Sequence, residues 1–154
     1  MKKLLFLFTA IFMFVSCKKE AEQQVLYPTM KVAVKEKGEF KVLNDSLLRQ
    51  EWEKELVNVQ GKIQGFEVEQ LTVKDTDAVA TVITAYCKDG KTTVGALLKE
   101  RDGYYYFNLN EAMVVCTGCI EGCKPQAVSV GRQFKLVCST CNDCVKTEFS
   151  PNIP

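Results

Sequence analysis

Alternating apolar and polar residues predict β-strands in two parts of the chain. In residues 28–43 the alternation is interrupted by Glu36-Lys37-Gly38-Glu39, which indicates two short strands or a hairpin. In residues 66–109 several strands follow, and two junctions carry the hairpin signal Asp-Gly, at Asp89-Gly90 and Asp102-Gly103. If both loops hold two residues, the facing pairs are Ile83 with Ala96, Ala85 with Val94, and Leu98 with Phe107.

Between these two regions the apolar period becomes that of a helix. Asn44-Asp45-Ser46 offers side-chain oxygens that can cap a helix N-terminus, and Gly61 is a natural stop. Four apolar side chains between them, spaced by four, four and three residues, fall on one helical face: Leu48, Trp52, Leu56 and Val59. We therefore expect a helix whose single tryptophan belongs to the hydrophobic core.

The predicted strands share an apolar face that can receive this helix. Its members are Val79, Thr81, Ile83, Ala85, Cys87, Val94, Ala96, Leu98, Phe107 and Leu109. The expected fold class is α+β, with one amphipathic helix packed on a small antiparallel β-sheet over residues 28–112. A Cys-rich β-hairpin module is expected to follow over residues 113–154. Cys87 is expected to be a small buried apolar residue.

Composition and charge limit the chemistry that the chain can perform. The chain has 154 residues, eight cysteines and no histidine. Without histidine there is no Ser-His or Cys-His nucleophile pair, no H-E-x-x-H zinc chemistry and no haem attachment through C-x-x-C-H. A formal net charge of +1 gives no electrostatic case for nucleic acid. The carboxylates form no recognisable site, and no Gly-rich phosphate loop is present, so we expect a protein that is not an enzyme.

The N-terminus has the pattern of a secretory signal. Two lysines, Lys2 and Lys3, precede twelve uncharged and mostly apolar residues, 4–15. A run of this length is too short to span a hydrocarbon core, which needs ~20 apolar residues. It fits the apolar region of a signal peptide, so we do not expect the segment to belong to the folded domain.

The end of this run, Phe14-Val15-Ser16-Cys17, resembles the lipobox of bacterial lipoproteins. In that family a small residue precedes a cysteine that is acylated and becomes the mature N-terminus; Phe14 stands where leucine is usual. The resemblance implies that residues 1–16 are a signal peptide, that Cys17 carries a diacylglyceryl group, and that residues 17–27 form a lipidated, flexible tether. It also implies a lipid-anchored protein of the bacterial cell envelope. Lys18 favours the outer membrane, because it is not the aspartate that resembles an inner-membrane retention signal.

Six cysteines form two triplets near the C-terminus. They are Cys116, Cys119 and Cys123, then Cys138, Cys141 and Cys144. Between the triplets lies an alternating segment with Gly131-Arg132 at its centre, which predicts a type II′ hairpin. Centring the turn there places Pro125 opposite Cys138, and this hairpin would gather both triplets at one end. So dense a cluster indicates sulfur chemistry.

Structural disulfides are the favoured interpretation of the cluster. The expected location is oxidising, the number of clustered cysteines is even, and the segment is too small to build its own core. Bonds between the triplets, such as Cys119–Cys144, fit the expected proximity better than bonds within one triplet. The sequence does not choose among the pairings that six cysteines allow.

The same cysteines also resemble a zinc ribbon, an iron–sulfur site and a redox site. Cys116-x2-Cys119 and Cys138-x2-Cys141, separated by eighteen residues, match the spacing of a zinc ribbon. Cys138, Cys141 and Cys144 copy the first three members of a ferredoxin iron–sulfur run, but Glu148 stands where the fourth cysteine would be. Thiol–disulfide exchange usually needs a helix after the C-x-x-C motif, and no convincing helix follows here.

The sequence therefore predicts a membrane-anchored, extracytoplasmic bacterial lipoprotein that is non-enzymatic and has a structural or partner-binding role. Its expected partners are the membrane, through the lipid on Cys17, and a protein of the envelope, with no nucleic acid. No cofactor is expected. The alternative is a metal-binding, zinc-ribbon-like or electron-transfer lipoprotein that uses the six clustered cysteines.

Overall fold

The computed structural model describes residues 29–56, 62–118 and 122–149, which form ten strands and one helix. In chain order these elements are β1 (Ala33–Glu36), β2 (Glu39–Val42), α1 (Asp45–Glu55), β3 (Ile63–Thr72), β4 (Val79–Cys87), β5 (Thr92–Arg101), β6 (Tyr104–Phe107), β7 (Met113–Thr117), β8 (Pro125–Val130), β9 (Gln133–Cys138) and β10 (Val145–Phe149).

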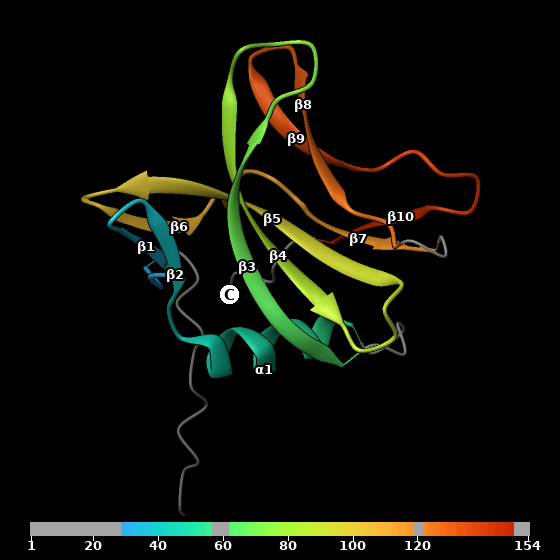
Figure 1. The fold of residues 1–154 in the computed structure, drawn as a ribbon, viewed down its shortest axis with the longest axis horizontal. Coiled ribbons are helices and arrows are strands. Elements are labelled where there is room, and N and C mark those ends of the chain that lie inside the picture. The colour runs from blue at the N-terminus through green and yellow to red at the C-terminus, as the bar shows by residue number, and fades with distance from the viewer. Residues whose placement is uncertain (1–28, 57–61, 119–121, 150–154) are drawn as a thin grey trace, which may run out of the picture.

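Strand β5 is the centre of an eight-stranded antiparallel sheet (Figure 1). One of its edges pairs with β4, which in turn pairs with β3. The other edge is shared, because β7 pairs with the first part of β5 and β6 pairs with the last part. β10 continues the sheet beyond β7, while β1 and β2 continue it beyond β6. Two strands of the segment 113–154, β7 and β10, are thus members of the main sheet.

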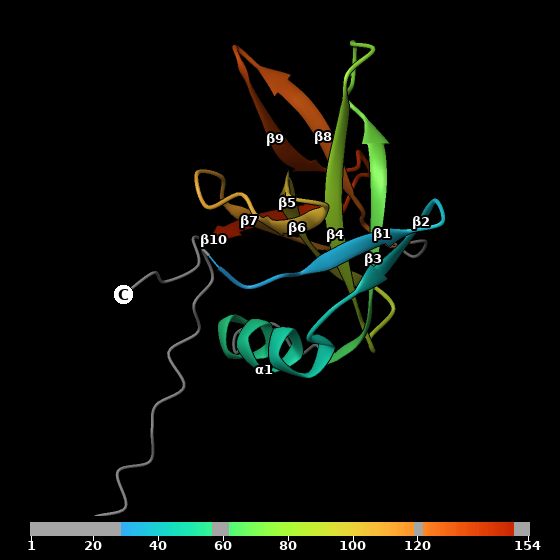
Figure 2. The same ribbon diagram turned by 90° about the vertical axis from the view of Figure 1, so that its left-hand side faces the viewer.

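This sheet is large and nearly closed, so the predicted α+β fold class is wrong. Strand β2, at one end of the strand order, comes back into contact with β3 at the other end. Twisted strands favour such curling, and closure hides sheet edges that would otherwise pair with other chains. The protein is mostly β, and its one described helix covers part of a curled sheet instead of forming a layer on a small one (Figure 2).

Helix α1 packs through the face that the sequence predicts. Leu48, Trp52 and Leu56 are buried, while Val59 and Gly61 lie outside the described residues. Polar side chains also tie the helix to the start of β3: Arg49 donates to the carbonyl oxygen of Ile63, and the Glu53 carboxylate accepts from the Ile63 amide at 2.9 Å.

The N-cap of α1 differs from the expected one. Asn44 occupies the cap position, but it has a left-handed backbone with φ of 56° and makes no side-chain cap bond. Its side-chain nitrogen instead donates to the carbonyl oxygen of Lys31 at 3.0 Å. The predicted cap residue therefore joins the helix start to the segment that enters β1.

The hairpin registers predicted from the turns are confirmed. Ile83 faces Ala96, Ala85 faces Val94, and Leu98 faces Phe107. The helix-side core, defined as the buried cluster that includes Trp52, contains these six residues together with Cys87. Three expected members of the face differ: Val79 is 51% exposed, and Thr81 and Leu109 are only partly buried. Val79 is the first residue of β4.

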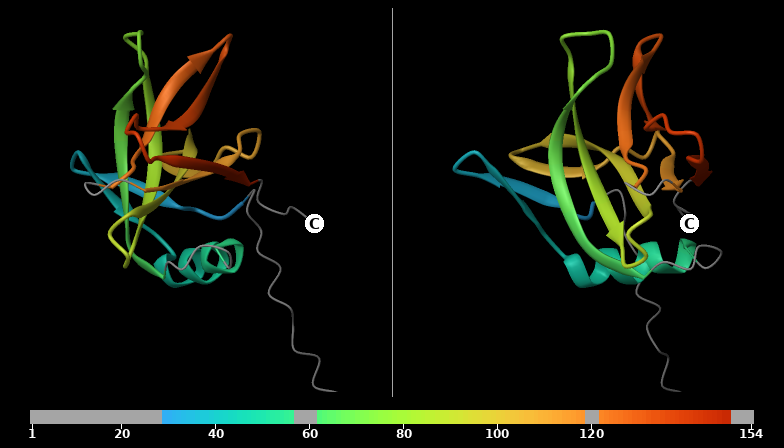
Figure 3. Two further views of the ribbon diagram at one scale, coloured as in Figure 1. Left: turned by 90° about the vertical axis from the view of Figure 1, so that its right-hand side faces the viewer. Right: turned by 45° about the vertical axis from the view of Figure 1, so that its right-hand side comes forward.

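The opposite face of the sheet is covered by the β8–β9 hairpin (Figures 2 and 3). A second buried cluster, which we call the hairpin-side core, joins sheet residues such as Val82, Leu97 and Val114 to Ala127 of β8 and Leu136 of β9. The hairpin has the predicted register, with Pro125 opposite Cys138 and Val130 opposite Gln133 across Gly131-Arg132. The central parts of β4 and β5 are therefore buried on both faces.

The described part of the chain has no helix of the length and apolarity that a membrane crossing requires.

Candidate functional site

The first disulfide fastens the β8–β9 hairpin to the main sheet. It joins Cys116 of β7 to Cys138 at the end of β9, with 5.5 Å between the two Cα atoms. Cys116 is fully buried in the hairpin-side core, and Cys138 packs against that core. The bond closes a sequence separation of 22 residues, which reduces the freedom of the unfolded chain.

The second disulfide joins the segment before β8 to the segment before β10. It connects Cys123, which is fully buried, to the partly exposed Cys144, with 5.9 Å between the Cα atoms. Cys144 immediately precedes β10, so this bond holds the start of the strand at the edge of the sheet.

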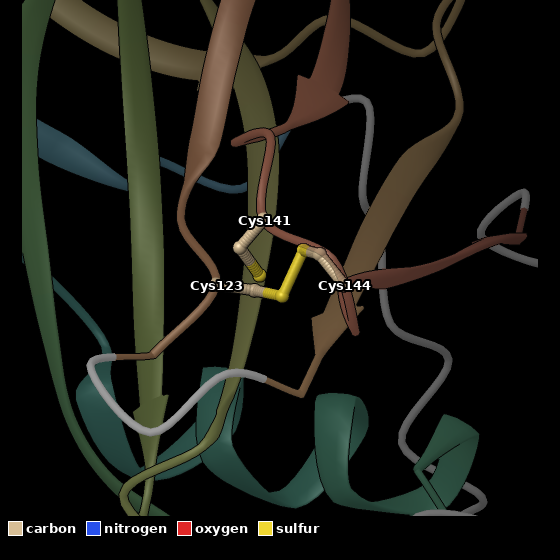
Figure 4. A group of neighbouring side chains, drawn as sticks. All are labelled: Cys123, Cys141 and Cys144. Atoms are coloured by element: carbon tan, nitrogen blue, oxygen red, sulfur yellow. A yellow bond between two sulfur atoms is a disulfide. The ribbon is translucent and has the colours of Figure 1, made fainter.

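Cys141 brings a third sulfur to this disulfide. The Sγ atoms of Cys123, Cys141 and Cys144 all lie within 4.8 Å of one another (Figure 4). Cys141 is itself disulfide-bonded, and its side chain is exposed. We call these three residues the sulfur cluster. It contains one buried, one partly exposed and one exposed cysteine, so it extends from the core to the surface.

Hydrogen bonds fix the chain around the buried member of the cluster. The Thr93 hydroxyl of β5 donates to the carbonyl oxygen of Cys123 at 2.6 Å. Lys124 and Ser139 are joined twice: the Ser139 amide donates to the Lys124 carbonyl at 2.8 Å, and the Lys124 amide donates to the Ser139 hydroxyl at 3.0 Å. The backbone at Cys123 and Lys124 is therefore held in place by hydrogen bonds.

The remaining two members lie on one tight turn. The Cys144 amide donates to the Cys141 carbonyl at 3.2 Å. This turn packs so closely on the end of β7 that a Cβ atom on Gly118 would lie 2.0 Å from the Asp143 carbonyl oxygen. Gly118 also has a φ of +123°, a region that L-residues rarely adopt. Glycine at this position therefore allows the turn to approach the sheet.

An open groove of 410 Å³ runs along the exposed side of the cluster. Cys138, Cys141 and Cys144 line it together with Lys146 of β10. The Lys146 ammonium pairs with the Glu148 carboxylate, and its hydrogen bond and charge lower the pKa of Glu148. A reagent in this groove could reach Cys141 directly, whereas Cys123 is covered.

The structure confirms disulfide bonding but changes the expected pairing. Cys144 is bonded to Cys123, so the suggested Cys119–Cys144 bond is wrong, and Cys119 itself lies outside the described residues. The predicted ladder ends one step beyond Pro125 and Cys138, with the Lys124–Ser139 pair. Beyond that pair the chain turns instead of continuing in register, so the predicted register does not extend to the outer cysteines.

The zinc-ribbon arrangement of Cys116, Cys119, Cys138 and Cys141 is not the one that the structure assembles. Two of these four cysteines, Cys116 and Cys138, are bonded to each other. The three sulfurs that do lie together belong to Cys123, Cys141 and Cys144. The sequence anticipates only part of this grouping: the C-x2-C spacing of Cys141 and Cys144 keeps these two sulfurs close along the chain, whereas Cys123 joins them through the fold.

Cys87 lies apart from the cluster and keeps a free thiol, as expected of a buried apolar residue. It lines a separate groove of 560 Å³ beside Phe66 and Tyr86. Burial, followed by the nearby Asp89 and Glu53 carboxylates, raises the pKa of the Cys87 thiol to about 11. A protonated, covered thiol is a poor nucleophile, so Cys87 does not make this groove a catalytic site.

Fold and site together define a mostly β protein with a nearly closed antiparallel sheet and a disulfide-bonded, Cys-rich region. The proposed acylation site, Cys17, lies outside the described residues. Comparisons with protein-family models, with curated proteins and with solved structures each found no match.

Proposed function

We propose that this protein is a membrane-anchored, extracytoplasmic bacterial lipoprotein. The observation that carries the proposal is the N-terminal sequence, in which a basic start and a short apolar run end at Ser16-Cys17. Two or more acyl chains near this cysteine would anchor the protein durably, since one chain alone binds a membrane only marginally.

The disulfides support the same location. Bonds such as Cys116–Cys138 and Cys123–Cys144 persist in oxidising compartments outside the cytoplasm and are rare inside it. They connect both strands that flank the β8–β9 hairpin, β7 and β10, to the hairpin region. We infer a non-enzymatic role, either in envelope structure or in binding a protein partner there.

Metabolic labelling with palmitate in a bacterial host tests the anchor. The full chain should incorporate the label and stay in the membrane fraction after washing without detergent. Cys17→Ala should lose the label, while the matched control Ser16→Gly, which keeps a small residue before the cysteine, should retain it. An unlabelled wild-type chain, or label that survives in Cys17→Ala, would contradict the proposal.

A second candidate function is the binding of a soft metal ion by the sulfur cluster in its reduced form. Three thiolates within 4.8 Å of one another could ligate an ion such as Zn²⁺, which thiolate sulfur binds at about 2.3 Å. If so, protein reduced without oxygen should retain zinc through gel filtration. Cys123→Ser should lose it and Cys87→Ala, a cysteine outside the cluster, should not. Reduced wild-type protein that retains no zinc would exclude this function.

A further inference from the structure

We propose that Cys123, Cys141 and Cys144 form a thiol–disulfide exchange site that accepts electrons from an external dithiol. In this site the disulfide of Cys123 moves from Cys144 to Cys141. The proposal goes beyond membrane anchoring and does not depend on the state of Cys17.

Proximity is the first requirement of exchange, and the cluster meets it. A disulfide is exchanged when a thiolate attacks one of its two sulfurs. The Cys141 sulfur already lies within 4.8 Å of both sulfurs of the Cys123–Cys144 bond (Figure 4). Because Cys141 and Cys144 share one hydrogen-bonded turn, either can serve as the partner of Cys123 with only a local change in the backbone.

Burial sets the direction of the exchange. Attack on Cys144 would release Cys123 as a thiolate at a position that is 0% exposed, where an uncompensated charge is costly. Attack on Cys123 releases Cys144 instead, which is partly exposed and can be solvated. The Cys141 thiolate should therefore attack the sulfur of Cys123.

Proximity separates the reactive bonds from the structural one. Cys141 is exposed and lines the open groove, so a dithiol can reach its sulfur. Cys138 lines the same groove, but neither Cys138 nor Cys116 belongs to the group of described sulfurs that lie within 4.8 Å of one another. The Cys116–Cys138 bond fastens the hairpin to β7 without sharing a sulfur with the cluster, so the hairpin should stay in place while the cluster exchanges.

The reaction balances in two steps. First, the external dithiol transfers two electrons and two protons to the disulfide that contains Cys141; the dithiol becomes a disulfide, and Cys141 and its former partner become thiols. Second, the Cys141 thiolate, having lost its proton to water, forms a bond to the Cys123 sulfur. The Cys123–Cys144 bond breaks, and Cys144 leaves as a thiolate that takes up a proton from water.

The exchange would change how the start of strand β10 is held. Cys144 is the residue directly before β10, and within the described chain this strand pairs only with β7. Loss of the Cys144 bond would release the start of β10 while its five-residue ladder with β7 remains. Exchange at the cluster would in this way change the edge of the main sheet.

Two-tag alkylation of the full chain tests the proposal. The oxidised protein is treated with one equivalent of dithiothreitol and its free thiols are blocked with a first maleimide. The remaining disulfides are then reduced, and the new thiols are blocked with a second, heavier maleimide. Fragmentation of the peptides assigns a tag to each cysteine. We expect the first tag on Cys144 and on the former partner of Cys141, and the second tag on Cys123, Cys141, Cys116 and Cys138.

Two results would overturn the exchange. A first tag on Cys141 would mean that its reduced thiol does not attack, and a first tag on Cys123 would mean that the dithiol reduces the Cys123–Cys144 bond directly. In Cys141→Ser the labelling of Cys144 should become about tenfold slower, because the attacking thiolate is gone, whereas the matched control Asn142→Ser, on the same turn, should behave as wild type. The tag found on Cys17 reports separately whether its thiol is free, so a failure of the lipid anchor is distinguishable from a failure of the exchange.

Discussion

Single residues decide whether the β8–β9 hairpin can lie against β5. Gly95 is in the middle of β5, where the neighbouring residues are buried on both faces of the sheet. A Cβ atom at this position would lie 2.6 Å from Cγ and 2.7 Å from Cβ of Pro125, the first residue of β8. The absence of a side chain at residue 95 therefore lets the hairpin seat on the sheet.

Gly95→Ala should displace the hairpin and lower the free energy of unfolding by about 1–3 kcal/mol, the usual effect of overpacking a dense core. Denaturant unfolding measures the change. Gly65→Ala is the matched control, because its added Cβ would meet nothing within 4 Å and its backbone is not left-handed. Equal effects of the two substitutions would show that the Pro125 contact is unimportant.

The buried thiol of Cys87 makes stability depend on pH. Its pKa is raised to about 11 in the folded protein, against about 8.5 in an unfolded chain. Below about pH 8.5 both states carry the proton. Above that pH the unfolded state releases the proton while the folded state still holds it. The stability contributed by the protonated Cys87 thiol is therefore lost as the pH rises toward and through its folded pKa.

Unfolding measured at pH 7.5 and pH 10 should therefore show a smaller pH-dependent loss of stability in Cys87→Ala than in wild type. The difference in pH-dependent stability loss between the two proteins gives the contribution of the Cys87 thiol, because the other groups that titrate in this range are the same in both. In the folded protein at pH 7.5, the Cys87 thiol should also resist alkylation until denaturant is added. Rapid labelling of native protein at Cys87 would contradict its burial.

At the scale of elements, the Trp52 side chain packs α1 against two strands of the sheet. The Trp52 ring lies 5.4 Å from the ring of Phe66 on β3 and 5.9 Å from the ring of Phe107 on β6, centroid to centroid. Within the described structure the buried indole nitrogen has no hydrogen-bond partner. The tryptophan therefore acts through apolar packing.

Trp52→Phe should cost about 1–2 kcal/mol of unfolding free energy, because it keeps an aromatic ring and loses no hydrogen bond. Trp52→Ala should cost about 3–5 kcal/mol, since it leaves a cavity between helix and sheet. Thermal and denaturant unfolding of both variants give the comparison. If Trp52→Phe lowered the free energy of unfolding as much as Trp52→Ala, the indole nitrogen would have a role that packing does not explain.

Local elements were predictable where a turn fixes them. Two-residue turns at Asp102-Gly103 and Gly131-Arg132 set the register of their hairpins as predicted, since such a turn leaves one pairing for the flanking strands. The loop between β4 and β5 holds four residues, 88–91, but it is centred on Asp89-Gly90 and therefore keeps the same register. The buried face of α1 was predictable because its apolar spacing is strictly helical.

The long-range arrangement was not predictable in the same way. No turn encodes the pairing of β5 with β7 or of β1 with β6, because these strands are joined through longer connections. One signal was available: residues 94–98 are apolar or glycine at every position, which indicates a strand covered on both faces. The disulfide pairing depends on how the chain leaves the β8–β9 ladder, and the cysteine spacing does not contain that information.

At the scale of the whole molecule, the disulfides join parts of the chain that the sheet alone leaves loosely connected. β10 is at one end of the strand order and is mostly exposed, and the β8–β9 hairpin forms a separate two-stranded sheet. The Cys116–Cys138 and Cys123–Cys144 bonds attach both to the core. A fold fastened in this way is suited to the oxidising space in which the proposed lipoprotein would reside.

The mass of the N-terminal peptide of the mature protein, isolated from a bacterial membrane, tests the proposed function most directly. The prediction is a peptide that begins at Cys17 and carries a diacylglyceryl group on its sulfur, with residues 1–16 removed. A mature chain that begins at another residue, or that begins at Cys17 with an unmodified thiol, would contradict the assignment of this protein as a lipoprotein.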